Sequence, residues 1–283
     1  WYANENSDSS RAPGNPLVDF LTGTTGQIRS PHPLFDARWY LERNTDVADS
    51  GLNPLVHYLK FGANERRDPH PLFDTNRYFE QAPDLPASRL DPLSHFIRVG
   101  AARRLDPCPL FDSAWYLARN PDLSELDANP LLHYLQTGWR EGRDPHPLFA
   151  ADWYLAQNPE VARAGINPLI HFVTQGALAG RSPHPLFDPG WYANDNPDPS
   201  RGPENALIDF LTSATGHARS PHPLFDARWY LEHNPDVSES GINPLLHYLT
   251  IGANERRDPH PLFDTNRYFE QAPDLPASRL DPL

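Results

Sequence analysis

Residues 31–41 read PHPLFDARWYL, and a close copy of this stretch returns every 38 residues. The copies begin at Pro31, Pro69, Pro107, Pro145, Pro183, Pro221 and Pro259. No insertion or deletion breaks the spacing, as expected of units that must dock on their neighbours in the same way. The stretch therefore predicts an all-α repeat array, an α-solenoid of 38-residue helix-turn-helix repeats with extended, Pro-rich connectors.

The period divides the whole chain, 1–283, into repeats of one array. They are a partial repeat at 1–30, the repeats 31–68, 69–106, 107–144, 145–182, 183–220 and 221–258, and a partial repeat at 259–283. A single repeat is too small to bury a core alone. Because the chain opens and stops partway through a repeat, we expect it to be an internal segment of a longer protein.

The first helix of each repeat is predicted to begin after an aspartate. In the repeat 31–68, Asp36 is a suitable N-cap, and Phe35 before it can pack on Tyr40. The helix should end near Asn44 and bury Trp39 and Tyr40.

The second helix has the stronger start signal. Asn53 can cap it, and Pro54 suits the first helical position, where its missing N–H costs nothing. Leu55 and Leu59 then fall on one apolar stripe with helical spacing. We expect both leucines to be buried, Gly62 to end the helix, and Arg38, Glu42 and Lys60 to be exposed.

A longer period of 190 residues, which is five repeats, also runs through the chain. Residues 191–283 match residues 1–93 at 74 of 93 positions. The odd repeats 1–30 and 183–220 share departures from the pattern. Asp19 and Asp209 replace a histidine, and the glycine that follows is displaced to Gly26 and Gly216. Either five repeats complete one superhelical turn, or the block records a duplication without structural meaning.

Composition excludes several classes of protein. The formal net charge of -13 argues against a nucleic-acid partner. No apolar run has the length of a membrane span, and the single cysteine excludes an internal disulfide framework.

Histidines recur in two positions of the repeat, and Cys108 replaces one of them. The first position holds His32, His70, His146, His184, His222 and His260, and the second holds His57, His95, His133, His171 and His247. Such a ladder resembles zinc ligands, with His32, His57, His70, His95, Cys108 and His133 as the first candidates. No CxxC or HExxH motif accompanies them, so we favour packed, hydrogen-bonded histidines and predict no metal site.

Other regular positions also admit a functional and a structural interpretation. The aspartates of the Asp36 position could bind calcium, but helix capping accounts for their spacing. The Trp39–Tyr40 pair could form a carbohydrate platform, although a buried core is favoured. Glu65, Arg66 and Arg67 suggest ion pairs rather than a site.

Catalysis finds no support in the sequence. An active site needs a unique group of residues, whereas nearly every polar residue here recurs in each repeat. Phosphate-binding loops, nucleophile elbows and haem-attachment motifs are absent. We therefore expect neither enzymatic activity nor a cofactor.

The pattern PLFDxxWYLxxNPDVxxxGxNPLxHYLxxGxxEGRDPHPLF, nearly complete over residues 107–149, resembles tandem repeats of large bacterial proteins. In those proteins the repeats flank glycosyltransferase-type domains or occur in long secreted, surface-associated chains. The resemblance covers the entire chain, and it implies an extracellular or cell-surface location.

Two functions remain open. The first is a structural protein, a segment of a long extracellular bacterial fibre or surface filament that associates with itself along or between chains. The alternative is a protein- or glycan-binding solenoid scaffold attached to a glycosyltransferase-type enzyme, which predicts clustered aromatic residues on one face.

Overall fold

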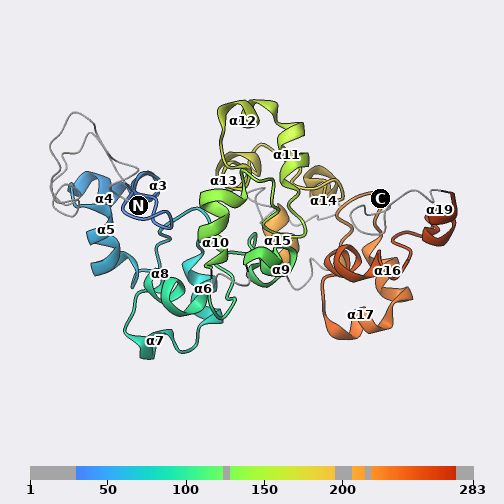
Figure 1. Cartoon of the computed structure of the whole chain (residues 1–283), viewed down its shortest axis with the longest axis horizontal. Helices are drawn as coiled ribbons and strands as arrows, with labels where there is room; N and C mark the ends of the chain where they lie inside the picture. Colours follow the sequence, from blue (N-terminus) through green and yellow to red (C-terminus); the bar gives the residue numbers. More distant parts are fainter. Residues whose placement is uncertain (1–29, 124–127, 195–205, 214–217, 272–283) are drawn as a thin grey trace. The chain divides into compact units, whose positions relative to one another are not determined.

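The computed structural model describes residues 30–123, 128–194, 206–213 and 218–271 (Figure 1). Contacts between residues divide the chain into two compact parts, Trp1–Glu141 and Gly142–Leu283. Within the described ranges the regular elements are helices, and no β-strand forms. The predicted all-α class, with repeated packed helix pairs, is confirmed.

A third, short helical segment that the sequence pattern did not predict lies between the two expected helices in the repeats 31–68, 69–106, 107–144, 145–182 and 221–258. In the repeat 31–68, helix A is α3 (Ala37–Arg43), the middle helix is α4 (Thr45–Ser50), and helix B is α5 (Pro54–His57). Helix B continues as the π-helix η1 (Tyr58–Gly62).

The other repeats follow the same order. Helix A is α6 (Thr75–Gln81), α9 (Ser113–Arg119), α11 (Ala151–Gln157), α14 (Pro189–Asn194), α16 (Ala227–His233) and α19 (Thr265–Gln271). The middle helix is α7 (Leu85–Ser88), the 3₁₀ turn η3 (Pro121–Leu123), α12 (Pro159–Ala164) and α17 (Pro235–Ser240). Helix B is α8 (Pro92–His95) with η2 (Phe96–Gly100), α10 (Pro130–His133) with η4 (Tyr134–Gly138), α13 (Pro168–His171) with η5 (Phe172–Gly176), α18 (Pro244–His247) with η8 (Tyr248–Gly252), and α15 (Ala206–Thr212).

The predicted helix starts are confirmed. The Asp36 side chain accepts a hydrogen bond from the Trp39 amide at 3.0 Å. The Asn53 side chain accepts from the Leu55 amide at 3.0 Å, with Pro54 in the first turn. Ala150 replaces the aspartate before α11, and that helix has no side-chain cap.

The Pro-rich connector contains a tight turn rather than extending throughout. The Phe35 amide donates to the His32 carbonyl at 3.0 Å, which closes a turn over the sequence HPLF. The same bridge forms in every repeat from 31 to 263. Proline keeps the chain out of the helix, and the turn redirects it.

Consecutive repeats are joined by one recurring backbone hydrogen bond. The N-cap residue of helix A donates its N–H to the carbonyl of the first proline in the next repeat. The pairs are Asp36–Pro69 at 3.0 Å, Asp74–Pro107 at 2.8 Å, Ala150–Pro183 at 3.1 Å, Asp188–Pro221 at 2.9 Å and Asp226–Pro259 at 3.0 Å. The turn that begins one repeat is therefore fastened to the helix start of the repeat before it.

The core consists of one aromatic cluster per repeat. In 31–68, the Phe35 ring lies 5.5 Å from that of Tyr40 and 5.6 Å from that of Tyr58, and the two tyrosine rings meet edge to face. All three side chains are fully buried. Such contacts between rings add to the stabilisation that burial itself provides.

Burial departs from expectation at three positions, Trp39, Leu55 and Leu59. Tyr40 is buried, and Arg38, Glu42 and Lys60 are exposed, as predicted. Trp39, however, is only half-buried, and Leu59 is 50% exposed. Leu59 is therefore corrected from the core to the surface, and Trp39 and Leu55 from buried to half-buried.

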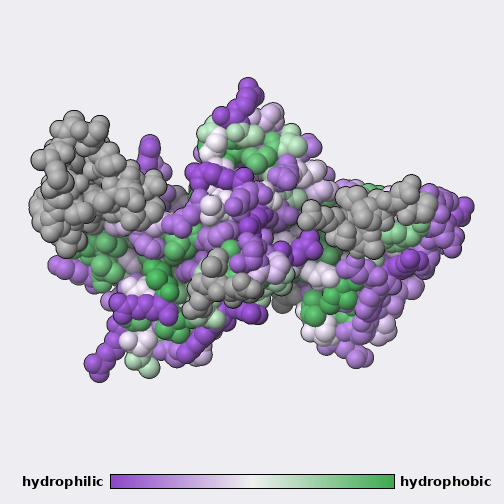
Figure 2. Space-filling view, viewed as in Figure 1, coloured by the Kyte–Doolittle hydropathy of each residue, from purple (hydrophilic) through white to green (hydrophobic). Residues whose placement is uncertain are grey.

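The π-helix accounts for the change along helix B. Its wider turn places Gly62, five residues after His57, over the core, and both residues are buried. Leu55 is half-buried here, although its equivalents Leu131 and Leu169 are fully buried. Leu59 lies outside this face, and Figure 2 shows apolar patches at the surface over α5 and α8.

Candidate functional site: two histidine positions and their partners

The second histidine position pairs with the buried tyrosine of helix A. The hydroxyl of Tyr40 and Nδ1 of His57 lie 3.0 Å apart and share a hydrogen bond. The equivalent pairs are Tyr78–His95 at 2.7 Å, Tyr116–His133 at 2.9 Å, Tyr154–His171 at 2.8 Å and Tyr230–His247 at 2.9 Å. We call this pair the tyrosine–histidine lock, because it ties helix A to helix B within each repeat.

Burial sets the protonation states of the lock. It raises the pKa of Tyr40 to about 12, and likewise that of Tyr154. It also lowers the pKa of His171 and of His247. In the lock of Tyr154 and His171 both partners are thus neutral near pH 7, and the pair forms an uncharged hydrogen bond in the core.

The glycine that ends helix B is required by the lock. A Cβ atom at Gly62 would collide with the Tyr40 hydroxyl, and the same holds at Gly100, Gly138, Gly176 and Gly252. None of these glycines has a positive φ. Helix B ends at Gly62, as predicted, but the glycine is needed there for close approach to the tyrosine rather than for a positive φ.

The odd repeat 183–220 replaces the lock by a charged version. The Tyr192 hydroxyl donates to Oδ2 of Asp209 at 2.7 Å, and Nη1 of Arg219 lies 3.2 Å from the same oxygen. Asp209 thus occupies the position of histidine and keeps the bond to tyrosine. Asp19, Gly26 and Gly216, the other shared departures, lie outside the described residues.

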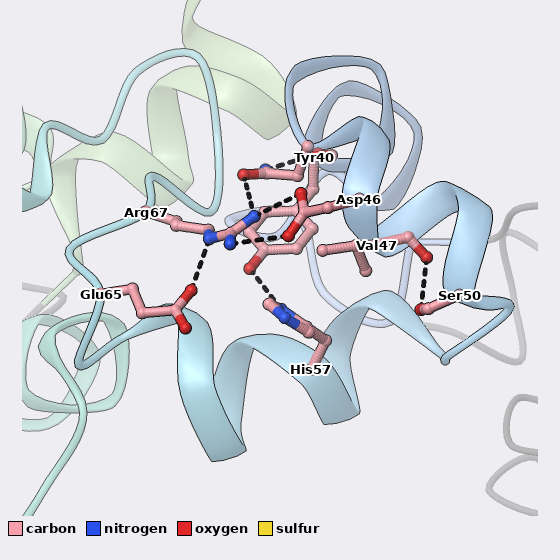
Figure 3. Close-up of polar contacts among 8 residues, drawn as sticks. Tyr40, Asp46, Val47, Ser50, His57, Glu65 and Arg67 are labelled. Carbon is pink, nitrogen blue, oxygen red and sulfur yellow. Dashed lines mark hydrogen bonds and ion pairs between the residues drawn. The ribbon is translucent and has the colours of Figure 1, made fainter.

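Arg67 is the equivalent of Arg219 in the repeat 31–68, and it binds a different set of partners (Figure 3). Arg67 donates to both carboxylate oxygens of Asp46, at 2.7 and 2.8 Å, to Asn44 at 2.9 Å and to Glu65 at 2.7 Å. It therefore clamps the end of helix B to the start of α4. Arg257 repeats this arrangement with Asp236, Asn234 and Glu255.

One repeat forms the clamp from a different position. In 69–106, Leu105 stands where Arg67 would be, but Arg103 donates to Asp84 at 2.6 Å. Asp84 is the equivalent of Asp46. These groups are the surface ion pairs that the sequence suggested, although Arg66 instead stacks on Phe79 of the next repeat, 4.6 Å from the ring centre.

The first histidine position has a separate role inside the connector turn. Nδ1 of each ring accepts a hydrogen bond from the backbone amide two residues later. The pairs are His32–Leu34 at 3.1 Å, His70–Leu72 at 3.0 Å, His146–Leu148 at 3.0 Å, His184–Leu186 at 3.1 Å, His222–Leu224 at 3.2 Å and His260–Leu262 at 3.1 Å. Nδ1 must therefore be unprotonated, with the ring proton on Nε2.

Burial disfavours the charged form of these rings. It lowers the pKa of His70 to about 3, with a smaller effect from His32 of the preceding repeat. It lowers the pKa of His184 to about 4, with a smaller effect from His222 of the next repeat. Histidines of consecutive repeats are thus close enough to sense each other's charge.

Cys108 fills the same place without a ring. Burial raises the pKa of its thiol to about 12, and the Leu110 amide bonds to the sulfur. The substitution keeps a side-chain acceptor for the same amide. It accounts for Cys108 as a structural residue of the turn.

These contacts bear on the metal hypothesis. In the described part of the chain, no group of three or more His, Cys, Asp or Glu side chains could hold a metal ion. The two histidine positions each spend Nδ1 on a hydrogen bond within their own repeat. Asp36 and its equivalents likewise accept from a helix amide, as capping requires.

The tryptophans of helix A are the residues on which the carbohydrate-platform hypothesis depends. Trp39, Trp115 and Trp153 are half-buried, and Trp191 is 45% exposed. Arg43 lies over the Trp39 ring at 5.6 Å, and Arg119 lies over Trp115 at the same distance. Guanidinium groups therefore cover part of the indole surface that a ligand would need.

Comparison of this chain with protein-family models, curated proteins and solved structures finds no match. Among the described residues, no helix is both long and apolar enough to cross a membrane.

The sequence contains a signal for the lock that the pattern analysis did not use. Tyrosine and histidine are separated by 17 residues in every complete lock. Where Asp19 and Asp209 replace histidine, Thr24 and Ala214 replace the glycine five residues later. This joint substitution indicates that the two positions meet in one packed site.

Proposed function

We propose that the chain is a structural tandem-repeat protein, a segment of a long extracellular bacterial fibre or surface filament. The observation that carries the proposal is the recurring backbone bond between repeats, from Asp36 to Pro69 and onward. The repeats 31–68, 69–106, 145–182, 183–220 and 221–258 offer the next repeat the same docking contact, so the array can be extended without a new kind of interface.

The use of the polar residues supports the same proposal. Tyr40, His57 and Gly62 form the lock, His32 closes the turn, and Arg67 clamps the helices. The residues that recur most regularly thus serve folding of the repeat. Catalysis has no part in this proposal, and self-association of the array is its expected partner interaction.

Electron microscopy of chains with different repeat numbers tests the proposal. Chains carrying one, two and three of the five-repeat blocks should form particles whose length grows by a constant increment, and antibody labelling of the native protein should mark filaments at the cell surface. Compact particles that do not lengthen, or labelling confined to the cell interior, would contradict it.

The alternative, a glycan-binding scaffold attached to an enzyme, is favoured by the half-exposed tryptophans of helix A. Binding of defined oligosaccharides to the isolated chain tests it, with quenching of tryptophan fluorescence as the readout. Substitution of the exposed Trp191 by Ala should then reduce binding, whereas Trp191→Tyr should preserve part of it.

A further inference from the structure

We propose that the histidine of each PHPLF turn is an acid-sensitive latch, which loosens the junction between repeats when Nδ1 becomes protonated. The latch is separate from the proposed structural function and does not depend on it. It rests on the hydrogen bond from the Leu72 amide to Nδ1 of His70, and on the same bond in the other histidine turns.

Protonation and the bond exclude each other. Nδ1 accepts the amide hydrogen through its lone pair, and a proton on that nitrogen removes the acceptor. The Leu72 amide is then left without its partner inside a buried turn, and an unpaired buried amide is costly. Opening of the turn relieves both the unpaired amide and the buried charge.

The latch reaches the junction through the chain itself. Pro69, which precedes His70, accepts the backbone bond from Asp36 of the preceding repeat. Phe73, which closes the turn, packs on Tyr78 in the core. Loss of the turn therefore weakens the bond between repeats and the aromatic cluster together.

Burial sets the direction of the effect, and the charged neighbours of the rings add to it or oppose it. The charges of His32 and His70 interact, as do those of His222 and His184, so protonation of consecutive turns adds repulsion between like charges. Asp188 acts on His222 in the opposite sense, but burial outweighs it and lowers the pKa of His222. Around the turn of Cys108 the charged groups are Asp74, Asp106 and Arg77.

The direction of the pH dependence follows from the pKa of His70 in the opened and in the closed turn. In the opened turn its pKa is near the ordinary value of 6.5, and in the closed turn it is about 3. The closed turn is therefore fully favoured above pH 6.5 and loses stability as the pH falls towards the folded pKa. The equilibrium constant for opening should rise about thirty-fold between pH 8 and pH 5.

Cys108 provides a control within the chain. Its thiol stays protonated between pH 5 and pH 8, because burial raises its pKa to about 12. The turn of the repeat 107–144 should therefore not loosen in acid, and the neighbouring Asp106, whose pKa burial raises to about 6, can only favour the closed form as the pH falls. The variant His70→Asn gives a second control, since an asparagine oxygen can accept the amide two residues on without titrating.

The test is amide hydrogen exchange of the full chain by NMR, corrected for the intrinsic rate at each pH. The opening constant of the Leu72 amide should rise about thirty-fold from pH 8 to pH 5, while that of Leu110 should not rise. In the His70→Asn variant, or in His70→Cys if asparagine disturbs folding, the Leu72 amide should lose this dependence. An unchanged Leu72 opening constant in the parent chain, or a full thirty-fold rise in both variants, would overturn the proposal.

Discussion

The hydroxyl of Tyr116 occupies the space that a Cβ atom at Gly138 would need. This contact requires glycine at the end of helix B, although the backbone there has ordinary helical angles. It also leads to a prediction in which each residue serves as the control for the other.

Gly138→Ala should destabilise the repeat by about 2 kcal/mol, because the added methyl group overpacks the lock. The Tyr116→Phe background removes the colliding oxygen, and the same alanine should then cost much less. Denaturant unfolding of the four chains of this double-mutant cycle measures the coupling. Additive effects would show that the hydroxyl is not the cause.

Two tyrosines of one repeat should respond in opposite ways to loss of the hydroxyl. Tyr40→Phe leaves Nδ1 of His57 without its bond and should cost about 1 kcal/mol. The Tyr58 hydroxyl is buried near the next repeat without a well-formed hydrogen bond. Tyr58→Phe should therefore be neutral or stabilising, and Phe96 and Phe172 already occupy that position.

The lock also marks the limit of what the sequence could predict. The helix starts at Asp36 and Asn53 depend on neighbouring residues in the chain, and these predictions are confirmed. The lock joins residues 17 positions apart, so it requires knowledge of how the helices pack. The π-helix was missed for a related reason, since it brings Gly62 under Tyr40 through a tertiary contact.

The predicted burial of Leu59 is wrong because the apolar stripe was assigned with the period of an α-helix, whereas this part of helix B is a π-helix. The turn at His32 was missed because two prolines favour an extended chain, whereas the histidine side chain closes a turn between them. Five repeats per superhelical turn stays a prediction.

Substitution by glycine should increase the stability of the connector at Arg104, which has a strained backbone conformation. Arg104 has φ 60°, where side chains cost about 1 kcal/mol, and Gly142 and Gly180 hold the equivalent places. Arg104→Gly should raise the melting temperature. Arg66→Gly should gain less, because it also loses the stacking of Arg66 on Phe79. Equal gains from the two variants would mean that the stacking contributes nothing.

Asp106 should show a pH dependence opposite to that of the histidine turns. Burial raises its pKa to about 6, so the folded state retains the proton, and the contribution of Asp106 falls as the pH rises through 6. Asp106→Ser keeps an acceptor for the Ser113 amide, as Ser220 does for Ala227. The variant should gain stability relative to the parent from pH 4 to pH 7. A difference in melting temperature that does not change with pH would contradict this.

The most direct test of the central claim, that repeats dock on their neighbours through the same contacts, is hydrogen exchange mass spectrometry of a Gly100→Ala chain. The substitution disturbs the lock of the repeat 69–106, where Tyr78 lies against Gly100. Protection should fall most in 69–106, less in the described residues of 31–68 and 107–141, and least beyond them. A uniform loss of protection along the whole chain, or a loss that stops at the borders of 69–106, would contradict the claim.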